Sequence, residues 1–395
     1  MVSRSAEFDR MALKVSKRGQ VAPFIVMDVL LAAHDLEAEG ASIMHMEIGQ
    51  PGTGAPKGVI EAAKKALDTK QLGYTESFGI PELRSAIRDH YIRTYGVYVP
   101  LERIAVTTGS SGAFVLSFIA AFEAGDKVAM ASPGYPAYRN ILTALDIEVV
   151  EIPVGPDTNF QPSPELLAAC GETLDGLIVA SPSNPAGTMI DPAGLEDLYA
   201  YCAEHGIRLI SDEIYHGITY VDPAETMLRF GDDAVIINSF SKYFSMTGWR
   251  LGWMVLPPDL VDACERLAPN LFISAPAVSQ YAAVAVFDCE DELQSNLVKY
   301  RENRELLLRE LPKAGFNKLA SVDGGFYIYA DVSELTNDSV SFCEAMLKEA
   351  GVAATPGTDF DPQRGHLFVR FSFARDPADM AEAAERLIKW RNGSL

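Results

Sequence analysis

Lys242 lies among small hydroxyl residues in the segment 239–250, and an apolar run follows this segment. A buried ammonium group loses its hydration, so a buried lysine is costly unless the protein uses it. Desolvation also favours the neutral amine, which can attack an aldehyde and form a Schiff base. The hydroxyls and Arg250 are suited to binding a phosphate group. A reactive amine beside a phosphate site predicts pyridoxal 5′-phosphate (PLP) as a cofactor.

Two other polar residues follow apolar, strand-like runs. Asn184 lies between Pro182 and Pro185, which restrict the loop and leave its amide free to donate a hydrogen bond. Asp212 ends an apolar run, so its carboxylate should be buried and should need a cationic partner. The protonated ring nitrogen of PLP would supply that partner. Taken alone, Asn184 could start a turn and Asp212 could cap a helix.

A third segment, residues 108–113, joins a predicted strand to a predicted helix and is rich in glycine and hydroxyl residues. Its backbone N–H groups, its hydroxyls and the start of the helix together favour an anion. Turns of this composition are common, so the motif alone fits a purely structural turn equally well.

These residues need a framework, and the chain predicts an α/β fold. From about residue 100, apolar runs alternate with helical patterns, which indicates a mostly parallel sheet with helices on both faces. The predicted strands are 104–107, 127–131, 148–152, 176–181, 208–211, 235–238 and 251–256, and the predicted helices include 111–123, 192–205 and 259–267. Ligands of such sheets bind beyond the carboxyl ends of the strands, where this assignment puts Asn184, Asp212 and Ser239.

The pattern changes near residue 290. A long charged helix over 291–311 precedes short strands at 318–321, 326–331, 352–355 and 366–371, with helices at 339–350 and 377–391. We therefore predict a large α/β domain over 45–290 and a smaller α+β domain built from 1–44 and 291–395. The run 23–33 is predicted as an amphipathic helix opening at Pro23, because Asp28 interrupts it and no cleavage site for a signal peptide follows.

Bulk properties exclude several classes of protein. The net charge of −21 over 395 residues argues against nucleic acid or an anionic membrane as the main partner. No segment approaches the roughly 20 apolar residues of a membrane span. The five cysteines are scattered without a CxxC motif, so neither a disulfide nor a metal site is predicted. We expect a cytoplasmic protein.

Residues 181–187, 211–215 and 239–250 together resemble, in order and spacing, the class I aminotransferases of PLP fold type I. The resemblance extends to residues 47–51, 74–84 and 368–372, and it therefore covers nearly the whole chain. It implies a large domain with a mostly parallel seven-stranded sheet, a smaller α+β domain, and transfer of an amino group from an L-amino acid to a 2-oxo acid.

The resemblance also implies roles for individual residues. Lys242 would hold PLP and move a proton at the substrate α-carbon, while Asp212 would pair with the ring nitrogen. Tyr215 would hydrogen-bond the phenolic oxygen together with Asn184, and Tyr135 would stack on the ring. The phosphate would be bound by Gly109, Ser110, Ser111, Ser239 and Arg250.

For the substrate, the resemblance implies that Arg370 binds the α-carboxylate through two hydrogen bonds, assisted by Gly49 and Asn184. Tyr74 would reach the phosphate in the neighbouring subunit, which implies an obligate homodimer.

The nature of the donor follows from cations that this chain lacks. Family members that act on acidic substrates carry a second cation at the position of Ser111 or in the partner's segment 270–276, and neither place carries one here. An unpaired buried carboxylate costs several kcal/mol. We therefore predict a neutral donor, aliphatic or aromatic. The resemblance implies 2-oxoglutarate or pyruvate as the acceptor. Candidates for its side-chain pocket are Phe24, Ile25, Phe272 and Ile273.

Other functions use the same residues. A C–S β-lyase or an aminocyclopropane carboxylate synthase of this fold would carry the same lysine, aspartate, asparagine and arginine. A non-catalytic PLP-binding domain of a transcription regulator is a more remote alternative, because the family pattern begins by Pro23 and the chain is acidic. An α/β domain without a ligand would leave Lys242 and Asp212 without partners.

Overall fold

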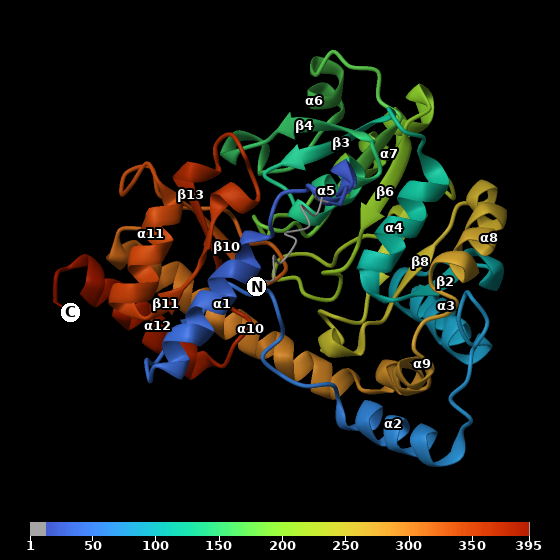
Figure 1. Ribbon diagram of the computed structural model, residues 1–395, viewed down its shortest axis with the longest axis horizontal. Coiled ribbons are helices and arrows are strands. Elements are labelled where there is room, and N and C mark those ends of the chain that lie inside the picture. The colour runs from blue at the N-terminus through green and yellow to red at the C-terminus, as the bar shows by residue number, and fades with distance from the viewer. Residues whose placement is uncertain (1–12, 395) are drawn as a thin grey trace, which may run out of the picture.

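The computed structural model describes residues 13–394. Its largest layer is a seven-stranded sheet in the order β2-β8-β7-β6-β5-β3-β4, shown in green, yellow and teal in Figure 1. Only β8 runs against its neighbours, and the other pairings are parallel, so the predicted mostly parallel sheet is confirmed. The strands are β2 Ile104–Thr107, β3 Lys127–Ser132, β4 Glu148–Pro153, β5 Gly176–Ala180, β6 Arg208–Asp212, β7 Val235–Ser239 and β8 Gly252–Val255.

Both faces of this sheet are buried, because alternate residues of its strands join two different apolar clusters. Leu177 and Leu209 belong to one cluster, while the adjacent Ile178 and Ile210 belong to the other. Successive side chains of a strand point to opposite faces, so helices must cover both of them. The helices of this part of the chain are α2 Lys57–Thr69, α3 Pro81–Tyr95, α4 Gly109–Ala121, α5 Pro136–Ala144, α6 Pro164–Ala169, α7 Pro192–His205, α8 Val261–Leu271 and α9 Ala277–Ala283.

Local sequence explains where these helices begin and end. The α7 helix starts with Pro192, whose missing N–H is not needed at that position, and the Asp191 side chain accepts a hydrogen bond from Gly194 N. It ends at Gly206, which adopts the left-handed conformation that favours glycine. The bounds 192–205 predicted from the sequence are therefore confirmed.

The rest of the chain forms a four-stranded sheet, β12-β13-β10-β9, and a short parallel pair, β1-β11. In Figure 1 the blue α1 helix lies beside these orange and red elements, and it contacts β11 and β12. The α1 helix begins at Ile25 instead of Pro23. The elements are α1 Ile25–Ala38, β1 Met44–His45, α10 Glu290–Glu310, β9 Lys318–Leu319, β10 Tyr327–Asp331, α11 Ser339–Ala345, β11 Val352–Ala353, β12 Thr355–Pro356, β13 Phe368–Ser372 and α12 Pro377–Arg391.

Three further observations bear on the sequence predictions. The α11 helix continues as a π-helical turn over Met346–Ala350, so the helix predicted over 339–350 changes type without ending. All five cysteines are free. No helix among residues 13–394 is both long and apolar enough to cross a membrane. The predicted domain boundaries at residues 44/45 and 290/291 stay a prediction.

Candidate active site

A cavity of about 550 Å³ lies beyond the carboxyl ends of β5, β6 and β7. Asp212 is the last residue of β6, Lys242 follows β7 by three positions, and Asn184 follows β5 by four. Parallel strands end at the same edge of a sheet, which is why residues far apart in sequence meet here. Of the site residues predicted from the sequence, the cavity is lined by Gly49, Ser110, Ser111, Tyr135, Asn184, Asp212, Tyr215, Lys242, Arg250 and Arg370.

Lys242 is partly buried, and its Nζ donates a hydrogen bond to the carbonyl oxygen of Gly49 at 2.7 Å. Burial lowers the pKa of Lys242 to about 8, and the positive charges of Arg370 and Arg250 act in the same direction. The charge of Asp212 opposes them. A neutral amine is therefore within reach near neutral pH, as a nucleophile or a general base requires.

Asp212 is buried, and no cation of residues 13–394 is in direct contact with its carboxylate. Its carboxylate accepts hydrogen bonds from the hydroxyl of Tyr138 and from Ile214 N, the latter at 3.1 Å. Burial raises the pKa of Asp212 to about 6, while both hydrogen bonds and the charge of Lys242 lower it. A protonated ring nitrogen beside this carboxylate would supply the missing positive charge.

Arg370, on β13, is 3% exposed and forms no salt bridge with a carboxylate of residues 13–394. Its Nη1 donates to Asn184 Oδ1 at 2.9 Å, and its Nη2 donates to Glu47 O and to Thr355 Oγ1. The guanidinium lies 4.4 Å from the centroid of the Tyr327 ring. Its Nε is buried and has no hydrogen-bond partner among residues 13–394. A buried guanidinium with an unused donor is suited to an anionic ligand.

Ser110 and Ser111 lie in the first turn of α4, where backbone N–H groups and the helix dipole favour an anion. Arg250 lies against this turn, and a Cβ added at Gly109 would approach its Nη2 to 2.7 Å. Gly109 also has a φ of +76°, so glycine is required there for two reasons. Together these groups have the charge and the hydrogen-bond donors that an anion such as phosphate requires.

Three of the predicted residues do not line the cavity: Gly109, Ser239 and Tyr74. Gly109 instead shapes the turn that presents Ser110 and Ser111 to the cavity. The Ser239 hydroxyl donates to Ser241 Oγ at 2.9 Å and is 1% exposed, while Ser241 reaches the cavity. Tyr74 is 89% exposed.

The structure adds residues that the sequence analysis missed. Tyr138 lies one helical turn after Tyr135 on α5 and hydrogen-bonds Asp212. Tyr327 on β10 pairs with Tyr215, their hydroxyl oxygens being 2.8 Å apart. It also restricts position 49, because a Cβ on Gly49 would lie 1.6 Å from the Tyr327 hydroxyl oxygen. A polar aromatic in an apolar segment carried no signal that would have separated these two tyrosines from core residues.

The apolar wall of the cavity comes mainly from the start of α1. Of the four predicted pocket residues, only Phe24 lines the cavity, and Ile25, Phe272 and Ile273 do not. The wall is completed by Val26, Met27 and Ile48. Because a helix turns through about 100° per residue, Val26 and Met27 can face the cavity while Ile25 does not.

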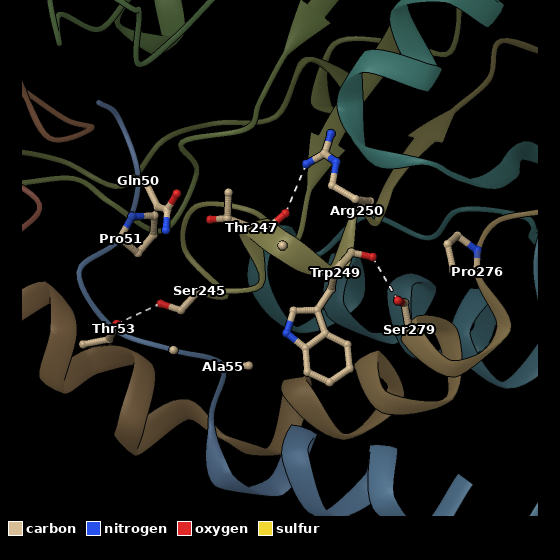
Figure 2. A pocket seen from close by; sticks show the side chains of 12 residues that line it. Gln50, Pro51, Thr53, Ala55, Ser245, Thr247, Trp249, Arg250, Pro276 and Ser279 are labelled. Atoms are coloured by element: carbon tan, nitrogen blue, oxygen red, sulfur yellow. Dashed lines mark hydrogen bonds between the residues drawn. The ribbon is translucent and has the colours of Figure 1, made fainter. Parts of the chain in front are cut away.

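A second cavity of about 470 Å³ adjoins the first and shares Gln50, Thr247 and Arg250 with it. Figure 2 shows Arg250 among the residues that line this second cavity, its Nη1 donating to Thr247 O at 3.1 Å. On the far side, the hydroxyls of Thr53 and Ser245 are 3.2 Å apart, and Ser279 donates to Trp249 O at 2.9 Å. The cationic face of Arg250 is therefore reachable from two sides.

This chain is similar to known proteins over nearly its whole length. The model of the family "Aminotransferase class I and II" matches residues 41–387. A valine–pyruvate aminotransferase of Mycobacterium tuberculosis is 49% identical over 381 residues, which are 95% of this chain and 98% of the relative.

Solved structures agree. An aminotransferase from Mycobacterium tuberculosis has a TM-score of 0.95 at 48% identity, covering 97% of this chain and 100% of that one. Aspartate aminotransferase from Thermus thermophilus, solved with maleate, has a TM-score of 0.90 at 30% identity, covering 96% and 100%. These relatives are named as aminotransferases, which favours transamination over the lyase and regulatory alternatives. The chain belongs to the class I and II aminotransferases, a PLP-dependent family, and is an enzyme that moves an amino group from an amino acid to a 2-oxo acid.

Proposed function

We propose that this aminotransferase uses a neutral, aliphatic L-amino acid as donor and pyruvate as acceptor. The number of cationic side chains in the cavity supports this donor class. Within the described part of the chain, the only cations that line the cavity are Lys242, Arg250 and Arg370. A distal carboxylate would have no cation left, at a cost of several kcal/mol. The relative named valine–pyruvate aminotransferase supports the same donor class and suggests the acceptor.

PLP fits the donor set of the cavity. When bound, it supplies an aldehyde that condenses with amines and a protonated ring that draws electrons from the substrate α-carbon. Lys242 would hold its aldehyde carbon, Asp212 would face the ring nitrogen, and Asn184 and Tyr215 would hydrogen-bond the phenolic oxygen. Tyr135 would stack on the ring. The phosphate would be held by Ser110, Ser111, Arg250 and Ser241, with Gly109 and Ser239 shaping the cradle.

The proton transfer belongs to Lys242. Burial lowers the pKa of its amine to about 8, so the amine can take the proton from the substrate α-carbon and release it again afterwards. The Gly49 carbonyl, 2.7 Å from Nζ, holds the amine at this edge of the cavity. Tyr215, whose pKa burial raises well above its usual value, stays a neutral hydrogen-bond donor.

Substrate orientation belongs to Arg370. Its Nη1 and Nη2, which share one edge of the guanidinium, can donate in parallel to the two oxygens of an α-carboxylate, once Asn184 and Thr355 yield part of their bonds. The donor side chain would then lie against Phe24, Val26 and Met27. Branched aliphatic groups bury their area well on such a wall.

The absorption spectrum tests the donor class directly. The purified holoenzyme is mixed with single L-amino acids in the absence of a 2-oxo acid, and the visible cofactor band is followed. We expect valine and alanine to bleach the band and aspartate to leave it unchanged. Adding pyruvate should restore the band faster than adding 2-oxoglutarate does.

Two outcomes would contradict this proposal. Bleaching by aspartate at the rate seen with valine would overturn the neutral-donor argument. Release of pyruvate and ammonia from cysteine, with the band unchanged, would point to the lyase instead.

We further propose a homodimer in which Tyr74 completes the partner's site. Tyr74 is exposed and outside its own cavity, and the second cavity beside Arg250 could accept a side chain from another subunit. Mixing Lys242→Ala and Tyr74→Phe subunits tests this. If Tyr74 acts across the interface, mixed dimers contain one intact site and activity returns. If it acts within its own subunit, no mixed dimer recovers activity. The cytoplasmic location stays a prediction.

A further inference from the structure

His34, Glu37 and His45 come together on the surface, away from the cavity. His34 and Glu37 lie one turn apart on α1, and His45 ends the short strand β1. One ligand atom from each side chain lies within 4.8 Å of the other two. Among residues 13–394 this is the one group of three or more histidine, cysteine or acidic side chains with such a spacing.

We propose that His34, Glu37 and His45 form a binding site for a divalent transition metal ion of the Zn²⁺ class. Imidazole nitrogens and one carboxylate oxygen are ligands that Zn²⁺ accepts, and three protein ligands leave a fourth position for water. The sequence predicted no metal site, because its cysteines form no metal-binding motif and the two histidines lie on different elements.

The distances fit a tetrahedral centre after small side-chain movements. With metal–ligand bonds of about 2.0–2.1 Å, two tetrahedral ligand atoms lie about 3.3 Å apart. His45 Nε2 and Glu37 Oε1 are 3.1 Å apart. Two imidazoles on one such metal place their ring centroids about 5 Å apart, and those of His34 and His45 are 5.8 Å apart. His34 is exposed and free to close the remaining gap.

A second carboxylate supports the assignment independently. Glu47 is 0% exposed, and its Oε1 lies 2.8 Å from His45 Nδ1. An Nδ1–H that donates to this carboxylate leaves the lone pair of Nε2 free to bind a metal ion beside Glu37. Metal-binding histidines are typically oriented by such a carboxylate on the other ring nitrogen. The two carboxylates, Glu37 and Glu47, also balance the two positive charges of the ion.

The site would connect two parts of the enzyme that shape the cavity. The α1 helix carries Val26 and Met27, which form the apolar wall, and β1 leads into Glu47 and Gly49. Glu47 O accepts hydrogen bonds from Arg370 Nη2 and from Thr355 Oγ1, the latter at 2.9 Å. A metal between α1 and β1 would therefore fix the wall of the donor pocket relative to the arginine.

Calorimetry of the chelator-treated, dialysed holoenzyme with Zn²⁺ tests the proposal. We expect one ion per chain with micromolar affinity or better, and a rise in melting temperature. His34→Ala and Glu37→Gln should abolish binding at micromolar Zn²⁺, whereas His205→Ala, which removes an exposed histidine on α7, should bind as the wild type does. Glu47→Gln should weaken binding by about 10- to 100-fold. If the Glu47→Gln variant does not fold, Zn²⁺ binding by the His34→Ala and Glu37→Gln variants decides the question.

Cobalt distinguishes the ligands. Co²⁺ at this site should give a tetrahedral d–d spectrum without a sulfur charge-transfer band. A charge-transfer band would assign binding to Cys170 or Cys289, the two cysteines that are not fully buried, and would overturn the proposal. A His34→Ala enzyme that binds Zn²⁺ like the wild type would also overturn the proposal. So would a wild type that binds no Zn²⁺, since His45 would then bridge Glu37 and Glu47 through N–H hydrogen bonds alone.

Discussion

Replacing Arg370 with lysine tests the substrate side of the site. The lysine keeps a positive charge but loses the planar fork, so it cannot donate in parallel to two carboxylate oxygens. It also leaves Asn184 Oδ1 and Glu47 O without the donors they have in the wild type. The α-carboxylate of the donor would then be buried beside a lysine that cannot satisfy both of its oxygens.

The expected loss follows from burial. Arg370 is 3% exposed, so its pairing with a carboxylate belongs to the buried class, in which breaking one side costs about 3–5 kcal/mol. At about 1.36 kcal/mol per tenfold change, kcat/KM for valine should fall by about 150-fold to about 5,000-fold. The fall should be smaller for isobutylamine, the amine that remains when the carboxylate of valine is replaced by hydrogen.

Single-turnover bleaching of the cofactor band measures both substrates. The matched control is Arg309→Lys, which changes an exposed arginine on α10 that pairs with Glu310 and should leave both rates unchanged. An equal loss for valine and isobutylamine in the Arg370→Lys enzyme would refute the reasoning. It would mean that Arg370 supports the fold around Glu47 and does not recognise a carboxylate.

Three further predictions concern the cofactor side. Burial raises the pKa of Asp212 from 3.8 to about 6, so its ionised form destabilises the folded cofactor-free protein. This destabilisation is absent below the pKa of the unfolded state and is complete above about pH 6. Asp212→Asn should therefore raise the free energy of unfolding by about 3 kcal/mol near pH 8 and by little near pH 4, as urea denaturation would report. PLP should rebind to the cofactor-free enzyme at a rate that rises with pH around a midpoint of about 8; a midpoint near the ordinary lysine value of 10.5 would contradict the lowered pKa of Lys242. Tyr138→Phe removes a hydrogen bond to Asp212, worth about 1–3 kcal/mol at a buried charged group, so the dissociation constant of PLP should rise about 5- to 150-fold. An unchanged constant would show that this bond does not support the cofactor.

Much of the framework could be predicted from the sequence because its signals are local. Apolar runs bounded by polar residues located all seven strands of the large sheet within one or two residues. Proline at the first position of α7 and α12 located where these helices begin. Parallel strands share one edge, so Asn184, Asp212 and Lys242, each at or just after the end of a strand, had to meet there.

The tertiary structure decided what depends on the direction of side chains and on packing between distant elements. Ser241 reaches the cavity while Ser239 lies behind it, because the chain leaves β7 between them and turns. Tyr138 and Tyr327 reach the site because α5 and β10 pack around it, although both look like core residues in sequence. His34 and Glu37 meet His45 only because α1 lies against the parallel pair of β1 and β11. No local pattern encodes such contacts, since they arise from the burial of apolar faces far from the polar residues that they bring together.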